Sequence, residues 1–223
     1  GAGYASVAVP ADLEAIFEIK LTEVMSAGFG ETPGRLESDA TQGIREHCEK
    51  AAAVVLGSGI GRGAGVDQLV VDLASSIEAP MVIDADGLGA LAGKVEALAS
   101  RQAATVLTPH VGEMSRLIGR TSAEVGETRL ASALELARRS GSLVVLKGDD
   151  TIITDGSRIA INDLPAPGLA TAGTGDVLAG VLGALLARGM EAFEAACVAV
   201  YCHSRAGGIA AAKAGSAEGV IAS

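Results

Sequence analysis

The chain has 223 residues, 49% of them hydrophobic, with 30 glycines and only 2% aromatic residues, a balance that favours one layered α/β domain over a disulfide-rich or fibrous protein. Lys and Arg number 17 against 27 for Asp and Glu, so the net charge of −10 opposes binding to nucleic acid and to anionic membranes. No uncharged apolar run reaches the roughly 18 residues of a membrane span, and no secretory signal is recognisable, so we expect a cytoplasmic protein.

Short aliphatic segments alternate with helical segments along the chain. The pattern predicts strands at residues 4–9, 23–26, 53–57, 81–84, 105–108 and 143–147, with helices at 38–51, 65–77, 87–99, 111–118 and 127–140. Continuously apolar strands indicate burial on both faces, as in a parallel sheet. Residues 151–154 and 158–162 flank Asp155-Gly156 and predict an antiparallel hairpin at the sheet edge. Long Ala-rich helices at 175–189 and 192–212 complete a doubly wound domain, whose ligands bind at the carboxyl ends of the strands.

The segment Ala172-Gly173-Thr174-Gly175-Asp176 leads directly into an apolar helix. A glycine-rich turn exposes backbone N–H groups, and a helix N-terminus adds partial positive charge, so the segment can cradle anionic oxygens. Asp176 at this helix start can accept a proton from a hydroxyl that attacks a phosphate. The alternative is that Asp176 only caps the helix.

The strand at 143–147 ends in Lys147-Gly148-Asp149-Asp150-Thr151. This places a cation and a flexible backbone at a carboxyl edge of the sheet, where Lys147 can neutralise phosphate and Thr151 can supply a hydroxyl. A lysine at a strand end is also often simply solvated.

Two further segments follow strand ends. The turn 57–63 carries glycines that permit close approach to a ligand, and Arg62 within it can pair with a phosphate. Pro109 stiffens the turn after residues 105–108 and aims His110 at the cleft mouth, whereas His47 and His203 lie within helices and are interpreted as structural.

Asp84 and Asp86 end the strand at 81–84. Two carboxylates there can orient a metal–phosphate group or a substrate hydroxyl. We interpret Asp86 rather as the cap of the following helix, and the role of Asp84 stays open.

In combination, these segments resemble the ADP-dependent NAD(P)H-hydrate dehydratases of the ribokinase-like superfamily. The matching segments follow in the family's order: 57–62, 82–88, 107–113, 144–151, 160–163, 169–180 and 199–212. The resemblance implies a three-layer α/β/α sandwich with a mostly parallel central sheet and an antiparallel edge hairpin. It also implies that residues 1–223 form a single catalytic domain without the family's first strand and helix.

The resemblance further implies the site residues. An adenine nucleotide, ADP or ATP, would be bound by Lys147, Gly148, Asp149, Asp150, Thr151 and Gly175, with Gly173, Thr174 and Gly175 as the phosphate loop. The choice of ADP as the donor rests on the resemblance alone. Hydrated NADH or NADPH would contact Gly59, His110 and Asp176, and Asp176 would be the catalytic base. Mg²⁺ would accompany ADP, with no protein residue assigned as its ligand, and a homotetramer would be the expected assembly.

The implied reaction is ADP-dependent dehydration of the S epimer of hydrated NADH and NADPH. One alternative is a small-molecule kinase of the same superfamily, acting on a hydroxymethylpyrimidine or hydroxyethylthiazole alcohol. Another is a nucleotide-binding relative without catalysis. The combination of residues 108–113 with Lys147-Gly148 suits the repair family better than the kinases.

Overall fold

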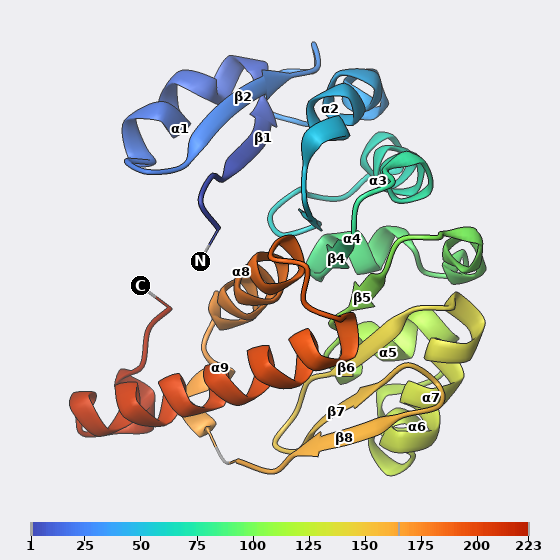
Figure 1. Ribbon diagram of the computed structural model, residues 1–223, viewed down its shortest axis with the longest axis vertical. Helices are drawn as coiled ribbons and strands as arrows, with labels where there is room; N and C mark the ends of the chain where they lie inside the picture. The colour runs from blue at the N-terminus through green and yellow to red at the C-terminus, as the bar shows by residue number, and fades with distance from the viewer. Residues whose placement is uncertain (1, 165, 223) are drawn as a thin grey trace.

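The computed structural model describes residues 2–164 and 166–222 (Figure 1). Its strands are β1 (Ser6–Pro10), β2 (Met25–Phe29), β3 (Val54–Leu56), β4 (Met81–Ile83), β5 (Thr105–Leu107), β6 (Leu143–Leu146), β7 (Thr151–Thr154) and β8 (Ile159–Asn162). Its α-helices are α1 (Glu14–Lys20), α2 (Thr41–His47), α3 (Ala64–Ser76), α4 (Ala85–Ala90), α5 (Val111–Ile118), α6 (Ser122–Glu127), α7 (Arg129–Ser140), α8 (Thr174–Ala187) and α9 (Ala192–Ala214).

The main sheet has six strands in the order β3-β4-β5-β6-β7-β8. Strands β3 to β6 run parallel, and β7 and β8 continue antiparallel as a hairpin at the edge. The mostly parallel sheet with an antiparallel edge hairpin is therefore confirmed. Strands β1 and β2 pair with each other in a separate two-stranded parallel sheet, at the blue end of the ribbon in Figure 1.

Helices cover both faces of the main sheet, because alternate strand residues point to opposite sides. Met81 and Ile83 of β4 belong to a core shared with α3, α5 and α7. Val82, between them, belongs to a second core shared with α8 and α9. In Figure 1, α8 and α9 accordingly lie across the sheet from α3. The three-layer α/β/α sandwich is confirmed.

Some local predictions need correction. The helix expected at 87–99 is two pieces, α4 and the 3₁₀ segment Val95–Ser100, because Gly93 adopts φ +73° and ends the helical backbone. The strand expected at 23–26 lies at Met25–Phe29. Helix α6 was not predicted, although its start carries a recognisable signal: Thr121 and Glu124 form a capping box.

Helix α9 places its small residues against the sheet. Ala195, Ala196 and Ala199 are buried in the core that contains Val145 of β6. This part of the Ala-rich face of α9 therefore packs on the sheet. Within the described ranges, none of the helices is both long and apolar enough to traverse a lipid bilayer.

Replacement of Arg101 by Met is expected to lower the free energy of unfolding by about 2 kcal/mol. Its guanidinium donates to the carbonyl oxygens of Ala74, Ile77 and Ala79. These carbonyls lie at and after the end of α3, where the helix supplies no N–H group to them. Urea unfolding measures the loss, with the exposed Arg116→Met on α5 as the matched control. Equal stability of the two variants would show that water satisfies these carbonyls equally well.

Candidate active site

The carboxyl ends of β4, β5 and β6 meet at one edge of the main sheet. They carry Asp84, the Pro109-His110 turn and Lys147 respectively. The backbone N–H of Lys147 donates to the carbonyl oxygen of Pro109 over 2.8 Å, which joins the segments that follow β5 and β6. The parallel arrangement of these strands, which the sequence predicted, thus brings distant residues together.

Lys147 is the centre of this edge. Its ammonium lies 2.9 Å from an Asp84 carboxylate oxygen and 3.8 Å from a Glu113 carboxylate oxygen. The side chains of Asp84 and Glu113 are only 2% and 9% exposed, and that of Lys147 is 22% exposed. Buried carboxylates require a compensating charge, and Lys147 supplies it. The open role of Asp84 is therefore first that of an ion-pair partner to Lys147.

Helix α8 begins against this ion pair. Gly173 adopts a left-handed conformation at φ +87°, and the Thr174 hydroxyl donates to the carbonyl oxygens of Leu169 and Thr171. A Cβ atom on Gly175 would lie 3.5 Å from the Lys147 ammonium, so the backbone itself approaches the charge. Asp176 follows in the first turn and is exposed.

His110 is the N-cap of α5, where its Nδ1 accepts hydrogen bonds from the backbone N–H groups of Gly112 and Glu113. Glu113 completes a capping box by accepting from the backbone N–H of His110. Because Nδ1 is the acceptor, the proton of the neutral ring sits on Nε2. The ring is exposed, but its Nε2 lies 3.5 Å from a Glu113 carboxylate oxygen, so a ligand would compete with Glu113 for this N–H.

The turn 57–63 is fastened to the start of α4. Asp86 accepts from the Gly61 backbone N–H over 3.2 Å and pairs with Arg62 over 3.0 Å. The prediction that Asp86 caps the following helix is wrong, because Asp84 occupies that N-cap position. Gly59 is exposed, with no atom within 4 Å of the place its Cβ would take.

Ala85, between the two aspartates, has φ +50° and is the one non-glycine residue with positive φ in the described chain. Such a backbone is strained for an alanine. It separates Asp84, which pairs with Lys147, from Asp86, which pairs with Arg62. The strained backbone of Ala85 therefore lies between two carboxylates, those of Asp84 and Asp86, that pair with different cations.

The loop after β6 carries the remaining nucleotide-binding candidates. Gly148, Asp149 and Asp150 are exposed, and the Thr151 hydroxyl donates to the carbonyl oxygen of Gly148. Arg129 of α7 contacts this loop through Asp150. Arg129 was absent from the sequence-based candidates, since nothing near it in the sequence indicates which loop it meets.

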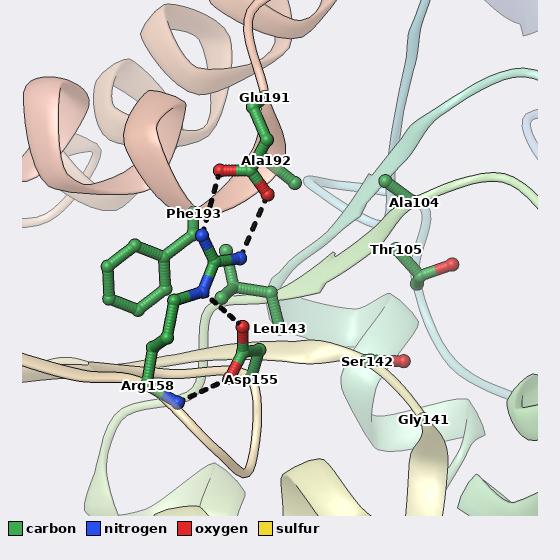
Figure 2. A pocket seen from close by; sticks show the side chains of 10 residues that line it. All are labelled: Ala104, Thr105, Gly141, Ser142, Leu143, Asp155, Arg158, Glu191, Ala192 and Phe193. Atoms are coloured by element: carbon green, nitrogen blue, oxygen red, sulfur yellow. Dashed lines mark hydrogen bonds and ion pairs between the residues drawn. The ribbon is translucent and has the colours of Figure 1, made fainter.

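The cavities described in the structure lie elsewhere. Figure 2 shows one of about 140 Å³ at the amino ends of β5 and β6, where Arg158 pairs with Asp155 and Glu191 and lies over the Phe193 ring. Burial acts to raise the pKa of Asp155, but hydrogen bonds from Arg158 and Ser157 outweigh it and lower the pKa. This network ties the β7–β8 hairpin to α9.

A second cavity, of about 290 Å³, lies along α9 beside Leu164 and Ile209. Neither cavity is lined by Lys147 or Asp176. The candidate site lies instead at the carboxyl edge of the sheet.

The charges at this edge bear on the expected magnesium ion. In the described ranges, no group of three or more His, Cys, Asp or Glu side chains is arranged to hold a metal. Asp84, Glu113 and Asp176 outnumber Lys147 at this edge, so a cation would reduce the repulsion between these carboxylates and the phosphates of a nucleoside diphosphate. Mg²⁺ commonly enters protein sites on nucleotide phosphates with few protein ligands. The few carboxylates at this edge are compatible with a Mg²⁺ ion that enters on the nucleotide.

His203 of α9 lies closer to the site than its helical position suggested. Burial lowers its pKa, a hydrogen bond with the backbone of Thr174 acts to raise it, and the charge of Lys147 lowers it further. His203 was interpreted as structural from sequence. The hydrogen bond between His203 and the backbone of Thr174, a phosphate-loop candidate, places the ring against the first residue of α8.

The lowered pKa of His203 predicts a pH effect on stability. Below the ordinary histidine pKa of about 6.5, the unfolded chain binds more protons than the folded chain. The free energy of unfolding therefore decreases as the pH is lowered. We expect His203→Gln to lose less unfolding free energy than wild type between pH 7 and pH 5. Urea unfolding at both pH values measures the difference, and an identical loss would contradict it.

The structure thus assembles Lys147, Gly175, Asp176 and His110 along one edge, with Asp84 and Glu113 behind them. Gly59 and the exposed Asp149 have no recorded contact with this group. Their predicted roles in ligand binding stay predictions.

Comparisons with known proteins bear on this arrangement. The bifunctional NAD(P)H-hydrate repair enzyme of Moorella thermoacetica is 39% identical over 214 residues, which cover 95% of this chain and 40% of that enzyme. The ADP-dependent (S)-NAD(P)H-hydrate dehydratase of Neisseria meningitidis is 40% identical over 174 residues, covering 76% of this chain and 59% of the relative. This chain therefore spans about two fifths to three fifths of the length of these relatives.

A solved structure agrees with both relatives. The ADP/ATP-dependent NAD(P)H-hydrate dehydratase of Bacillus subtilis, co-crystallised with ATP and Mg²⁺, superposes with a TM-score of 0.80 at 25% identity, covering all of this chain and 75% of that one. The family profile described as NAD(P)H-hydrate dehydratase matches residues 1–222. With the fold, the order of motifs and nearly the full length in agreement, the chain belongs to the NAD(P)H-hydrate dehydratase family.

Proposed function

We propose that this chain catalyses ADP-dependent dehydration of the S epimer of hydrated NADH and NADPH. One observation carries the proposal: the exposed carboxylate of Asp176 stands in the first turn of α8, directly after Gly175, whose backbone meets the Lys147–Asp84 ion pair. A base thus stands beside a helix N-terminus and a lysine, both of which attract phosphate.

Asp176 accepts the proton of the C6 hydroxyl of the hydrated ring as this oxygen attacks the β-phosphorus of ADP. The bond between the β-phosphorus and the bridging oxygen breaks, and AMP leaves. The new phosphate ester is a far better leaving group than hydroxide. The lone pair of the ring nitrogen then expels inorganic phosphate. The resulting iminium ion loses a proton from C5, which forms the C5–C6 double bond and restores the dihydronicotinamide.

The remaining residues bind and orient. The backbone N–H groups of the first turn of α8, which begins after Gly173, face the transferring phosphoryl group. Lys147 neutralises the charge of this group. His110 donates its Nε2–H to the dinucleotide. Mg²⁺ accompanying the nucleotide would supply further charge neutralisation.

The relatives guide the choice of substrates. The name of the Neisseria relative gives ADP and the S epimer, and the name of the Bacillus structure gives ADP or ATP. We propose ADP as the donor here, with hydrated NADH and NADPH as acceptors.

The test mixes this chain with ADP, Mg²⁺ and each epimer of hydrated NADH, and follows dihydronicotinamide absorbance together with AMP and phosphate. The proposal expects recovery of absorbance with the S epimer only, and equal amounts of AMP and phosphate. Nucleotide consumption that depends instead on hydroxymethylpyrimidine or hydroxyethylthiazole would identify a kinase. ADP binding without turnover would identify a non-catalytic nucleotide-binding protein.

A further inference from the structure

Arg129, the first residue of α7, bridges the two ends of the loop that follows β6. Its Nη2 donates to the carbonyl oxygen of Asp150 over 2.7 Å and lies 3.4 Å from a carboxylate oxygen of the same residue. The carbonyl oxygens of Leu146 and Lys147 each lie 3.5 Å from guanidinium nitrogens. One side chain therefore contacts the loop where it leaves β6 and where it enters β7.

The location of Arg129 is unfavourable for the helix itself. A cation in the first turn opposes the helix dipole, which favours acidic residues there. The side chain is only 18% exposed, and its Nε is buried without a hydrogen-bond partner among the described residues. Each of these features destabilises the folded chain. The contacts with the loop are what offset them.

These contacts determine which way the loop presents its N–H groups. No cis peptide bond occurs in the described chain, and in a trans peptide the C=O and N–H point in opposite directions. Since the carbonyl of Lys147 faces Arg129, the N–H of Gly148 faces away from it. The N–H of Lys147 is occupied by Pro109, whereas that of Gly148 donates to no described residue and is available to an anion.

Gly148 lies directly against the same guanidinium. A Cβ atom at this position would lie 2.5 Å from both Nη atoms of Arg129, so any side chain displaces them. No positive φ requires glycine there. Lys147 and Gly148 thus both contact Arg129 through their backbone, although Arg129 lies 18 residues before Lys147 in the sequence.

We propose that Arg129 is a positioning residue for nucleotide binding. It holds residues 147–151 so that the Lys147 ammonium and the Gly148 N–H both face the phosphates of ADP. The inference rests on the proposed function, because it assigns this loop to the nucleotide.

The test compares Arg129→Lys with Arg139→Lys, a matched control on α7 whose side chain pairs with Glu96 and Glu135. Lysine keeps the charge but loses the planar fork. We expect Arg129→Lys to raise the Kd of ADP in calorimetry and the KM for ADP about tenfold, with kcat within about twofold of wild type. The control leaves all three quantities unchanged.

A second variant tests the same contact with Arg129 intact. Gly148→Ala is expected to weaken ADP binding by pushing the guanidinium aside. In the Arg129→Lys background its effect is expected to be smaller than in wild type, because the two residues act through one contact. Additive effects, or an unchanged Kd in either single variant, would overturn the inference.

Failure of the proposed function is distinguishable from failure of this inference. A wild-type chain that binds ADP without turning over the hydrate overturns the proposed reaction, while the Kd comparison still decides the role of Arg129. A wild-type chain that binds no adenine nucleotide overturns both.

Discussion

Asp176→Asn is expected to lower kcat about 10³-fold, because asparagine cannot take the proton of the attacking hydroxyl. The affinity for ADP should stay within about threefold of wild type, since the helix N-terminus and Lys147 remain. Single-turnover absorbance measurements give the rate, and calorimetry gives the Kd. The exposed position of Asp176 makes a folding defect from this isosteric change small.

The matched control is Asp67→Asn, which removes a carboxylate from the first turn of α3. It should leave both kcat and the Kd of ADP unchanged. Turnover by Asp176→Asn at the wild-type rate would show that Asp176 is not the base, whatever the Kd of ADP proves to be.

Lys147→Met is expected to reduce ADP affinity at least about tenfold and the free energy of unfolding by about 3 kcal/mol. The first effect follows from the loss of a cation that faces phosphate. The second follows because Asp84, 2% exposed, loses its ion-pair partner. Calorimetry and urea unfolding measure the two effects separately, and the exposed Lys94→Met should change neither.

The double variant Lys147→Met with Asp84→Asn separates the two roles of the lysine. Removing the unpaired carboxylate should restore most of the lost stability, because a neutral pair replaces a lone buried charge. ADP binding should remain weak. Recovery of wild-type ADP affinity in the double variant would show that Lys147 acts only by neutralising Asp84.

Several features of the site could be predicted because their signals are local. The glycine before α8 and the helix that follows were recognised from neighbouring residues, and the structure has Gly173 in the left-handed conformation directly before Thr174. The capping box joins His110 and Glu113, three positions apart in the chain. Such signals work because caps and turns are formed by residues adjacent in the chain.

Other features could not be predicted, since they depend on which strands become neighbours. The Lys147–Asp84 pair joins residues 63 apart in sequence, and the Arg129 contact with Asp150 joins residues 21 apart. The incorrect interpretation of Asp86 as a helix cap has the same origin. Its partners, Gly61 and Arg62, come from the turn after the adjacent strand.

By itself, the sequence determined the layered α/β class, the hairpin, the family resemblance and the segments that carry the candidate chemistry. Only the tertiary structure decided the charge partners of Lys147, the loop held by Arg129 and the separate pairing of β1 with β2. The physical reason is that periodicity and caps record the local conformation and burial of a segment. Ion pairs and close backbone contacts exist only once strand order has brought distant segments together.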